Sequence, residues 1–235
     1  AALIEVTRRC VGIPILVVAG FFLIYALTYG LTNPEFFGRV KYLIRNLFYT
    51  KEGILSTPVN VCSKFIVVFI IFGAFLERTG ISNFFISLAN CVAGRFAGGP
   101  AKVAVISSAL CGMVSGSSVG NTVTTGSVTI PMMKKTGYKP EFAGAVEAAS
   151  STGGQIMPPI MGAAAFLMAD FVGVPYSSII GRAVLPAVLY FLGIFISVHL
   201  EAKKLKLTGI SKSELPKFTH LLKKIYLLLP LVMLV

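Results

Sequence analysis

Two polar segments interrupt the apolar sequence between residues 100 and 172, and their side chains are of kinds that bind ions. The first segment, residues 115–122, reads Ser-Gly-Ser-Ser-Val-Gly-Asn-Thr. The second, residues 150–159, reads Ser-Ser-Thr-Gly-Gly-Gln-Ile-Met-Pro-Pro. Neither contains a charged residue, so each offers hydroxyl, carboxamide and backbone carbonyl oxygens. Hard cations take oxygen ligands, and the composition of both segments therefore favours a small alkali cation.

The first segment combines small residues with side-chain oxygens. Gly112, Gly116 and Gly120 recur every four residues, a spacing that allows close approach to a neighbouring helix. The candidate oxygen ligands are Ser115, Ser117, Ser118, Asn121 and Thr122. The Ser118 hydroxyl could cap the helix that follows, and the N–H groups of that helix could face an anion. The alternative is a tight helical turn whose hydroxyls bond only to nearby carbonyls.

The second segment repeats this chemistry. Gly153 and Gly154 permit backbone dihedral angles that other residues avoid. Pro158 and the proline after it lack N–H groups, which leaves carbonyls one turn earlier free to coordinate an ion. Side-chain oxygens come from Thr152 and Gln155. Alone, this pattern also fits a simple proline kink, but two such segments in one short stretch favour a shared site.

Charged residues in the same apolar region are candidates for function, because charge inside a membrane is costly. Glu147 precedes the second segment and Asp170 follows it. Glu147 could carry a proton or help to hold a cation. It could equally form an ion pair with Lys102 or Arg182, and Arg182 could instead meet a substrate carboxylate.

The composition indicates an integral membrane protein. Of 235 residues, 55% are hydrophobic and only 13% are charged, whereas soluble domains carry about 25% charged residues. The formal net charge of +12 fits basic cytoplasmic loops rather than nucleic-acid binding. An enzyme is not expected, since a serine nucleophile such as Ser115 needs a base, and the two histidines, His199 and His220, lie in or beside a basic loop.

The elements that position the two segments are helices. The apolar runs beside each segment are shorter than the roughly 20 residues that cross a bilayer. Broken helices that meet near the middle of the membrane form the ion and substrate sites of secondary transporters. The expected fold is therefore an all-α polytopic membrane protein. Its predicted elements are spans at 11–31, 59–76 and 176–200, a shorter span at 81–97, an interfacial amphipathic helix at 36–50, a re-entrant hairpin at 100–134 and a broken helix at 139–172.

The distribution of lysine and arginine predicts the topology. With the basic residues 201–224 on the cytoplasmic side, a re-entrant hairpin keeps residues 134–139 and 31–57 on that side as well. This arrangement gives five crossings, an odd number, so that a second unit of the same kind would be inverted. The apolar residues 225–235 are expected to begin that second unit, in a longer protein.

The two polar segments resemble those of a known family. Residues 112–127 and 147–166 together are similar to motifs of the large membrane subunit of tripartite ATP-independent periplasmic (TRAP) transporters, particularly of fused permeases that join the small and large subunits. The resemblance extends from about Val11 to Lys204. It implies a permease of the bacterial inner membrane that imports organic anions, usually carboxylates, by an elevator mechanism.

The resemblance also implies an ion, partners and site residues. Sodium would be the coupling ion, with a proton as the alternative, and no other cofactor is expected. A periplasmic binding protein would deliver the substrate, and the other half of the permease and the small-subunit helices would complete the transporter. One sodium ion would be held by residues of both segments, namely Ser115, Gly116, Ser117, Ser118, Asn121, Thr152, Gly153, Gly154 and Pro158. Ser118, Asn121 and Thr122 would lie nearest the substrate.

The expected division of the chain follows from these roles. It comprises scaffold helices at 1–97, transport-domain elements at 98–174, the last helix of the repeat at 175–200, a basic cytoplasmic loop at 201–224 and the start of a second repeat at 225–235. Two other functions stay open at this point. One is an elevator-type carrier without a binding protein, and the other is a membrane scaffold whose breaks are only kinks.

Overall fold

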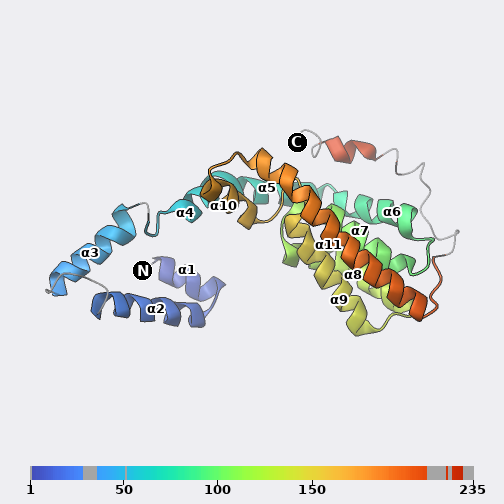
Figure 1. Cartoon of the computed structure of the whole chain (residues 1–235), viewed down its shortest axis with the longest axis horizontal. Coiled ribbons are helices and arrows are strands. Elements are labelled where there is room, and N and C mark those ends of the chain that lie inside the picture. The colour runs from blue at the N-terminus through green and yellow to red at the C-terminus, as the bar shows by residue number, and fades with distance from the viewer. Residues whose placement is uncertain (1, 29–35, 51, 211–220, 222–223, 230–235) are drawn as a thin grey trace. The chain divides into compact units, whose positions relative to one another are not determined.

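A computed structural model describes residues 2–28, 36–50, 52–210, 221 and 224–229 (Figure 1). Within these ranges the secondary structure consists of helices and turns, without a β-strand, which confirms the predicted all-α class. The chain forms two compact units, Ala1–Asn60 and Val61–Val235. Each unit is described by itself.

The first unit contains three helices, which are α1 (Ala2–Cys10), α2 (Ile13–Thr28) and α3 (Phe36–Tyr49). The apolar α2 begins near the start of the predicted span 11–31, whose last residues lie outside the described ranges. Helix α3 confirms the predicted helix at 36–50. The Arg39 guanidinium donates through Nη1 to the carbonyls of Leu27 and Thr28, each at 3.1 Å. It thus satisfies carbonyls that the end of α2 leaves without helical partners.

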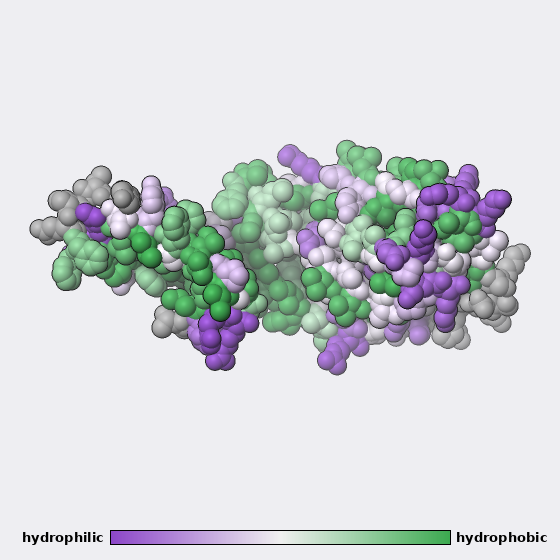
Figure 2. Space-filling model, turned by 90° about the horizontal axis from the view of Figure 1, so that it is seen from below, coloured by the Kyte–Doolittle hydropathy of each residue, from purple (hydrophilic) through white to green (hydrophobic). Residues whose placement is uncertain are grey.

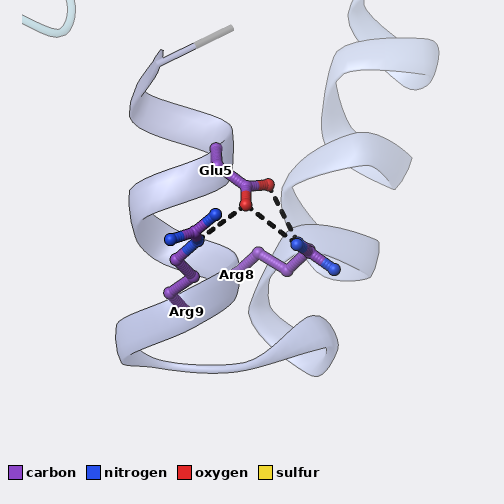
Figure 3. Close-up of polar contacts among 3 residues, drawn as sticks. All are labelled: Glu5, Arg8 and Arg9. Carbon is purple, nitrogen blue, oxygen red and sulfur yellow. Dashed lines mark hydrogen bonds and ion pairs between the residues drawn. The ribbon is translucent and has the colours of Figure 1, made fainter.

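A glutamate of the polar first helix, α1, forms ion pairs with two arginines of the same helix (Figure 3). Glu5 accepts from Arg8 Nη2 and from Arg9 Nε, both at 2.8 Å. The guanidinium of Arg8, and after it that of Arg9, lowers the pKa of Glu5 from its ordinary value. The attraction between Glu5 and the two arginines is therefore fully present when the pH is above the ordinary pKa of glutamate. It is lost as the pH falls through the lowered pKa of Glu5. Because the three side chains are exposed, water weakens the interaction.

Residues 57–78 form one continuous helix with an internal π-helical turn. It consists of α4 (Thr57–Val61), the π-helix Cys62–Ile66 and α5 (Val67–Arg78). Together with α11 (Tyr176–Lys204), it is one of two helices among the described residues that are long and apolar enough to cross a membrane. Both correspond to predicted spans. The predicted third span is a shorter helix, α6 (Ile81–Ala93), because the chain turns before Gly98.

The predicted hairpin and broken helix are both present as interrupted helices. The hairpin consists of α7 (Gly99–Ser115) and α8 (Ser118–Lys135). The broken helix consists of α9 (Pro140–Gly153), a 3-10 turn at Gly154–Ile156 and α10 (Ala163–Val172). Helices α7, α8, α9 and α11 pack side by side in the second unit (Figure 1).

Small side chains allow these helices to pack closely. Ala101 and Ala104 of α7, Ala143 of α9 and Ala202 of α11 are fully buried in one cluster. Helix α11 continues without interruption across Pro186. It also runs to Lys204 instead of ending near residue 200, so that its last two lysines stabilise the negative end of the helix dipole.

Much of the surface of both units is apolar, as the green side chains in Figure 2 show. Phe21 and Ile24 of α2 and Leu185 of α11 are each more than 60% exposed. Exposed apolar area of this extent marks surfaces that meet a membrane or a partner. Of the predicted basic loop 201–224, residues 211–220, 222 and 223 lie outside the described ranges, as do residues 230–235 of the predicted second repeat. Residues Ile225–Leu228 form a 3-10 turn.

Candidate functional site

The first polar segment ends one helix and starts the next. Gly116 has φ +59°, a left-handed conformation that closes α7 and that glycine adopts without strain. Ser117 is extended, and its Oγ accepts from Gly120 N at 3.2 Å, which caps α8. The cap is therefore Ser117, and the expectation that Ser118 caps this helix is wrong. The Ser118 hydroxyl is instead free to reach the second segment.

The second polar segment breaks its helix more widely. Helix α9 passes into the 3-10 turn at Gly154, and the chain is then irregular until α10 begins at Ala163. Within this stretch, Gly162 N donates to Gln155 O at 2.6 Å. The peptide bond between Pro158 and Pro159 is cis. Both segments interrupt their helices, which confirms the prediction from the sequence.

The two segments lie against each other. Gly112 and Gly154 are so close that a Cβ added to Gly154 would lie 2.8 Å from Gly112 Cα. Gln155 Nε2 donates to Ser118 Oγ at 2.8 Å, which joins the second segment directly to the first. A Cβ on Gly116 would in turn collide with the Met161 carbonyl. Three contacts along the segments therefore hold the two helix breaks together.

Asn121 lies next to Gly154 of the second segment and has one polar atom unsatisfied. Its side chain is 1% exposed, and Nδ2 donates to the Ser108 carbonyl at 2.9 Å. Because a carbonyl only accepts, this contact fixes which side-chain atom is the nitrogen. Asn121 Oδ1 then has no hydrogen-bond partner. A buried oxygen without a partner is costly, so Oδ1 is suited to a cation.

The other predicted ligands differ in how they are used. The hydroxyls of Thr122 and Thr152 donate to carbonyls of their own helices, Ser118 O and Ala148 O, both at 2.8 Å. For these two residues the structure shows local bonding, the alternative considered for the first segment. Ser115, Gly116 and Ser117 line a cavity of about 330 Å³ together with Gln155. The structure thus brings Ser118, Asn121 and Gly154 together, while Thr122 and Thr152 turn away.

Tyr176 supports the second segment and was not identified from the sequence. Its hydroxyl lies 2.9 Å from Pro159 O and 2.7 Å from Ile160 O, and it donates to these carbonyls. Its ring stacks on Phe166 with centroids 4.3 Å apart. Tyr176 begins α11, well beyond the polar segment, so residue spacing gave no signal for this role.

Glu147 is fully buried behind the contact between the segments. Its Oε1 accepts from Ser108 Oγ at 2.9 Å, from Ser151 Oγ at 3.0 Å and from the Thr125 hydroxyl. Its Oε2 accepts from the Thr129 hydroxyl. No ion pair with Glu147 is found in the part of the chain that the structure describes.

The basic partners considered for Glu147 are placed elsewhere. Lys102 Nζ lies 3.0 Å from His199 Nδ1, and it also sits over the ring of Phe195. Arg182 is exposed on α11, as is Asp170 on α10. The suggested pairing of Glu147 with Lys102 or Arg182 is therefore wrong.

Comparison with known proteins identifies the family. The family model described as the tripartite ATP-independent periplasmic transporter, DctM component, matches residues 1–235. The chain belongs to the DctM family. Among curated DctM relatives, the C4-dicarboxylate TRAP transporter large permease protein of Pseudomonas aeruginosa is 29% identical over 192 residues. That match covers 81% of this chain and 42% of the relative.

Shorter matches to other proteins are more identical. The C4-dicarboxylate TRAP transporter large permease protein DctM of Rhodobacter capsulatus is 36% identical over 91 residues, which cover 39% of this chain and 21% of that protein. The uncharacterized protein YgiK of Salmonella typhimurium is 32% identical over 91 residues, with the same coverage. The chain thus spans less than half the length of these relatives.

Proposed function

We propose that this chain is part of the permease of a TRAP transporter in a bacterial inner membrane. The complete transporter would use a sodium gradient to drive the import of organic anions. The observation that carries the proposal is the contact between two helix breaks around the unsatisfied Asn121 Oδ1. Family membership supports the permease role. The names of the relatives, which refer to C4-dicarboxylates, support an organic-anion substrate.

The proposed sodium site uses uncharged oxygens from both segments. Asn121 Oδ1 is the side-chain ligand, and backbone carbonyls of the two breaks complete the shell. The candidate residues remain Ser115, Gly116, Ser117, Ser118, Asn121, Thr152, Gly153, Gly154 and Pro158, with Thr152 contributing through its backbone. Bound sodium would join the segments that Gln155 already connects to Ser118. Ion binding would thereby stabilise the closed contact between hairpin and broken helix.

The proposed substrate site adjoins the ion. Helix α8 begins at Ser118, and the N–H groups at a helix start attract anions. The predicted substrate residues Ser118, Asn121 and Thr122 all lie in its first turns. An anionic substrate here would also be attracted by the adjacent sodium, which explains why the two would move together.

The proposed transport cycle needs further components. We assign residues 98–174 to the moving transport domain and residues 1–97 to the scaffold, in an elevator mechanism. The periplasmic binding protein, the small-subunit helices and a second permease half complete the transporter. A carrier without a binding protein is the second candidate. The gene neighbourhood separates the two, because a partner-dependent permease should be encoded beside a secreted binding protein.

Uptake by the complete transporter tests this function. The transporter is reconstituted in liposomes with its binding protein, and entry of a radiolabelled C4-dicarboxylate is measured with an inward sodium gradient or with choline. We expect uptake with sodium and with binding protein, and only background when either is omitted. Uptake that ignores both sodium and proton gradients would contradict the proposal, and no uptake of any organic anion would favour a membrane scaffold.

A double-mutant cycle tests the link between the segments. We expect Ser118→Ala and Gln155→Ala each to weaken the apparent sodium affinity of uptake about two- to tenfold, the usual effect of losing one hydrogen bond. The double variant should be no worse than the more damaging single variant, because both remove the same contact. Ser127→Ala is the control, since the Ser127 hydroxyl donates to Thr124 O of its own helix and Ser127 is not among the candidate site residues. Additive effects would show that the contact does not support the ion site.

A further inference from the structure

The hydroxyl cluster around Glu147 can satisfy this carboxyl group in either charge state. When Glu147 is ionised, Ser108, Thr125, Ser151 and Thr129 can each donate one proton to it. When it is protonated, its Oε2–H can donate to the Thr129 hydroxyl. That hydroxyl then donates to Thr125 O, which lies 3.0 Å away. Only hydroxyl rotations separate the two states, so protonation requires no movement of heavy atoms.

The surroundings of Glu147 offer no fixed positive charge among the described residues. Helix α7 carries the buried, uncharged Cys111, and its Lys102 is bound to His199 of α11. The basic residues of α8, Lys134 and Lys135, are exposed in its last turn.

The remaining elements packed against α9 add no cation at Glu147. On α11, the Tyr190 hydroxyl donates to Ala149 O at 2.9 Å, and Arg182 is exposed. The 3-10 turn after α9 has no titratable residue, and Glu141 of α9 itself is exposed. A carboxylate that is ionised and buried without a counter-ion is strongly disfavoured. Glu147 can avoid this cost either by taking up a proton or by having a mobile cation nearby.

Two residues connect this cluster to the proposed sodium site. Ser108 donates its hydroxyl to Glu147 and accepts Asn121 Nδ2 on its carbonyl at 2.9 Å. The Thr125 hydroxyl contacts both Glu147 and the Asn121 carbonyl, the latter at 2.7 Å. Asn121 is thus one residue away from the carboxylate along each path. A cation held by Asn121 and the charge on Glu147 would thus be linked through Ser108 and Thr125, in a buried medium where charges interact strongly.

We infer that Glu147 is a proton site that supplies the counter-charge for sodium, so that sodium binding at the two helix breaks releases the Glu147 proton. The inference rests on the proposed sodium site. In this step the carboxyl O–H bond breaks, its electron pair stays on Glu147 as the carboxylate charge, and the proton passes to water. One positive charge enters the site as another leaves, so the net charge of the buried region is unchanged.

Sodium-induced infrared difference spectra of the complete transporter test the inference. When sodium chloride replaces N-methylglucamine chloride at mildly acidic pH, we expect the wild type to lose the carbonyl band of a protonated carboxylic acid. Its apparent sodium affinity for uptake should also fall, by up to roughly tenfold per pH unit, as the medium becomes more acidic. In Glu147→Gln, both the band and this pH dependence should be absent. A wild type without the band, or a band that persists in Glu147→Gln, would overturn the inference.

A milder pair of variants keeps the test decisive if Glu147→Gln does not fold. Thr129→Val preserves side-chain shape and removes the hydroxyl that bonds Oε2 in both charge states. Because hydrogen bonds to a charged group are the stronger ones, the ionised state loses more, and sodium should release the proton only at higher pH than in the wild type. Thr124→Val is the matched control, because the Thr124 hydroxyl donates to Gly120 O on its own helix. A Thr129→Val profile identical to the wild type would contradict the role of Glu147. Sodium-driven uptake without any carboxyl signal would overturn this inference alone, whereas uptake indifferent to sodium would overturn the sodium site as well.

Discussion

Replacing Gly154 with alanine should reduce sodium-driven uptake by about two orders of magnitude, because small displacements of a binding geometry can cost this much. The new Cβ would lie 2.8 Å from Gly112 Cα, which is backbone and cannot rotate away. Gly154 has φ −58° and ψ −26°, dihedral angles that alanine adopts freely. The effect would therefore come from separating the two helix breaks and not from backbone strain. Uptake by reconstituted Gly154→Ala transporter measures it.

Gly144→Ala provides the matched control for this substitution. Gly144 lies in α9, and a Cβ added there would meet no atom within 4 Å. Alanine is the better helix former, so Gly144→Ala should keep wild-type uptake and at least wild-type thermal stability. If Gly154→Ala and Gly144→Ala behave alike, close contact between the breaks is not required for transport.

Substituting Asn121 with alanine should weaken the apparent sodium affinity of uptake by at least about tenfold, since polar interactions with a charged partner contribute about 1.5–3 kcal/mol. The change removes Oδ1, the buried oxygen that has no protein partner. It also removes the bond to Ser108 O that orients the side chain. Sodium titration of uptake measures this effect. The maximal rate of uptake at saturating sodium should fall by a smaller factor than the apparent sodium affinity, because the substitution affects ion binding and not the fold.

Asn90→Ala is the control that distinguishes the loss of the proposed sodium ligand from the loss of an asparagine elsewhere in the protein. Asn90 lies in α6, and its amide donates to Ile86 O of the same helix at 3.1 Å. This variant should bind sodium within about twofold of the wild type, as expected for a single weak hydrogen bond away from the ion. An Asn121→Ala transporter with unchanged sodium affinity and unchanged expression would remove Asn121 from the site.

The helix breaks could be predicted because their local chemistry is distinctive. Gly116 closes α7, and Pro158 lies in the non-helical stretch between the 3-10 turn and α10, for reasons that depend on a few neighbouring residues. Contacts between the breaks depend instead on how separate helices pack. The pairing of Ser118 with Gln155 and the support from Tyr176 therefore became visible only in the structure.

The contacts of Glu147 could likewise be predicted from the sequence only in part. The sequence indicated that Glu147 is a candidate functional residue, but it suggested basic side chains as its partners. Its actual partners include Thr125 and Thr129, which share one face of α8 with Asn121 at a spacing of four residues. This spacing was a usable signal. The contribution of Ser108, on a different helix, required knowing that α7 and α8 fold against each other.

The position of bound sodium tests the central claim most directly. Cryo-electron microscopy of the complete transporter, prepared once in sodium chloride and once in N-methylglucamine chloride, compares the same site in the two ionic conditions. We predict density within coordination distance of Asn121 Oδ1, between the two helix breaks, in sodium only. Density that is identical in both preparations, or a sodium ion bound away from Asn121, would contradict the account.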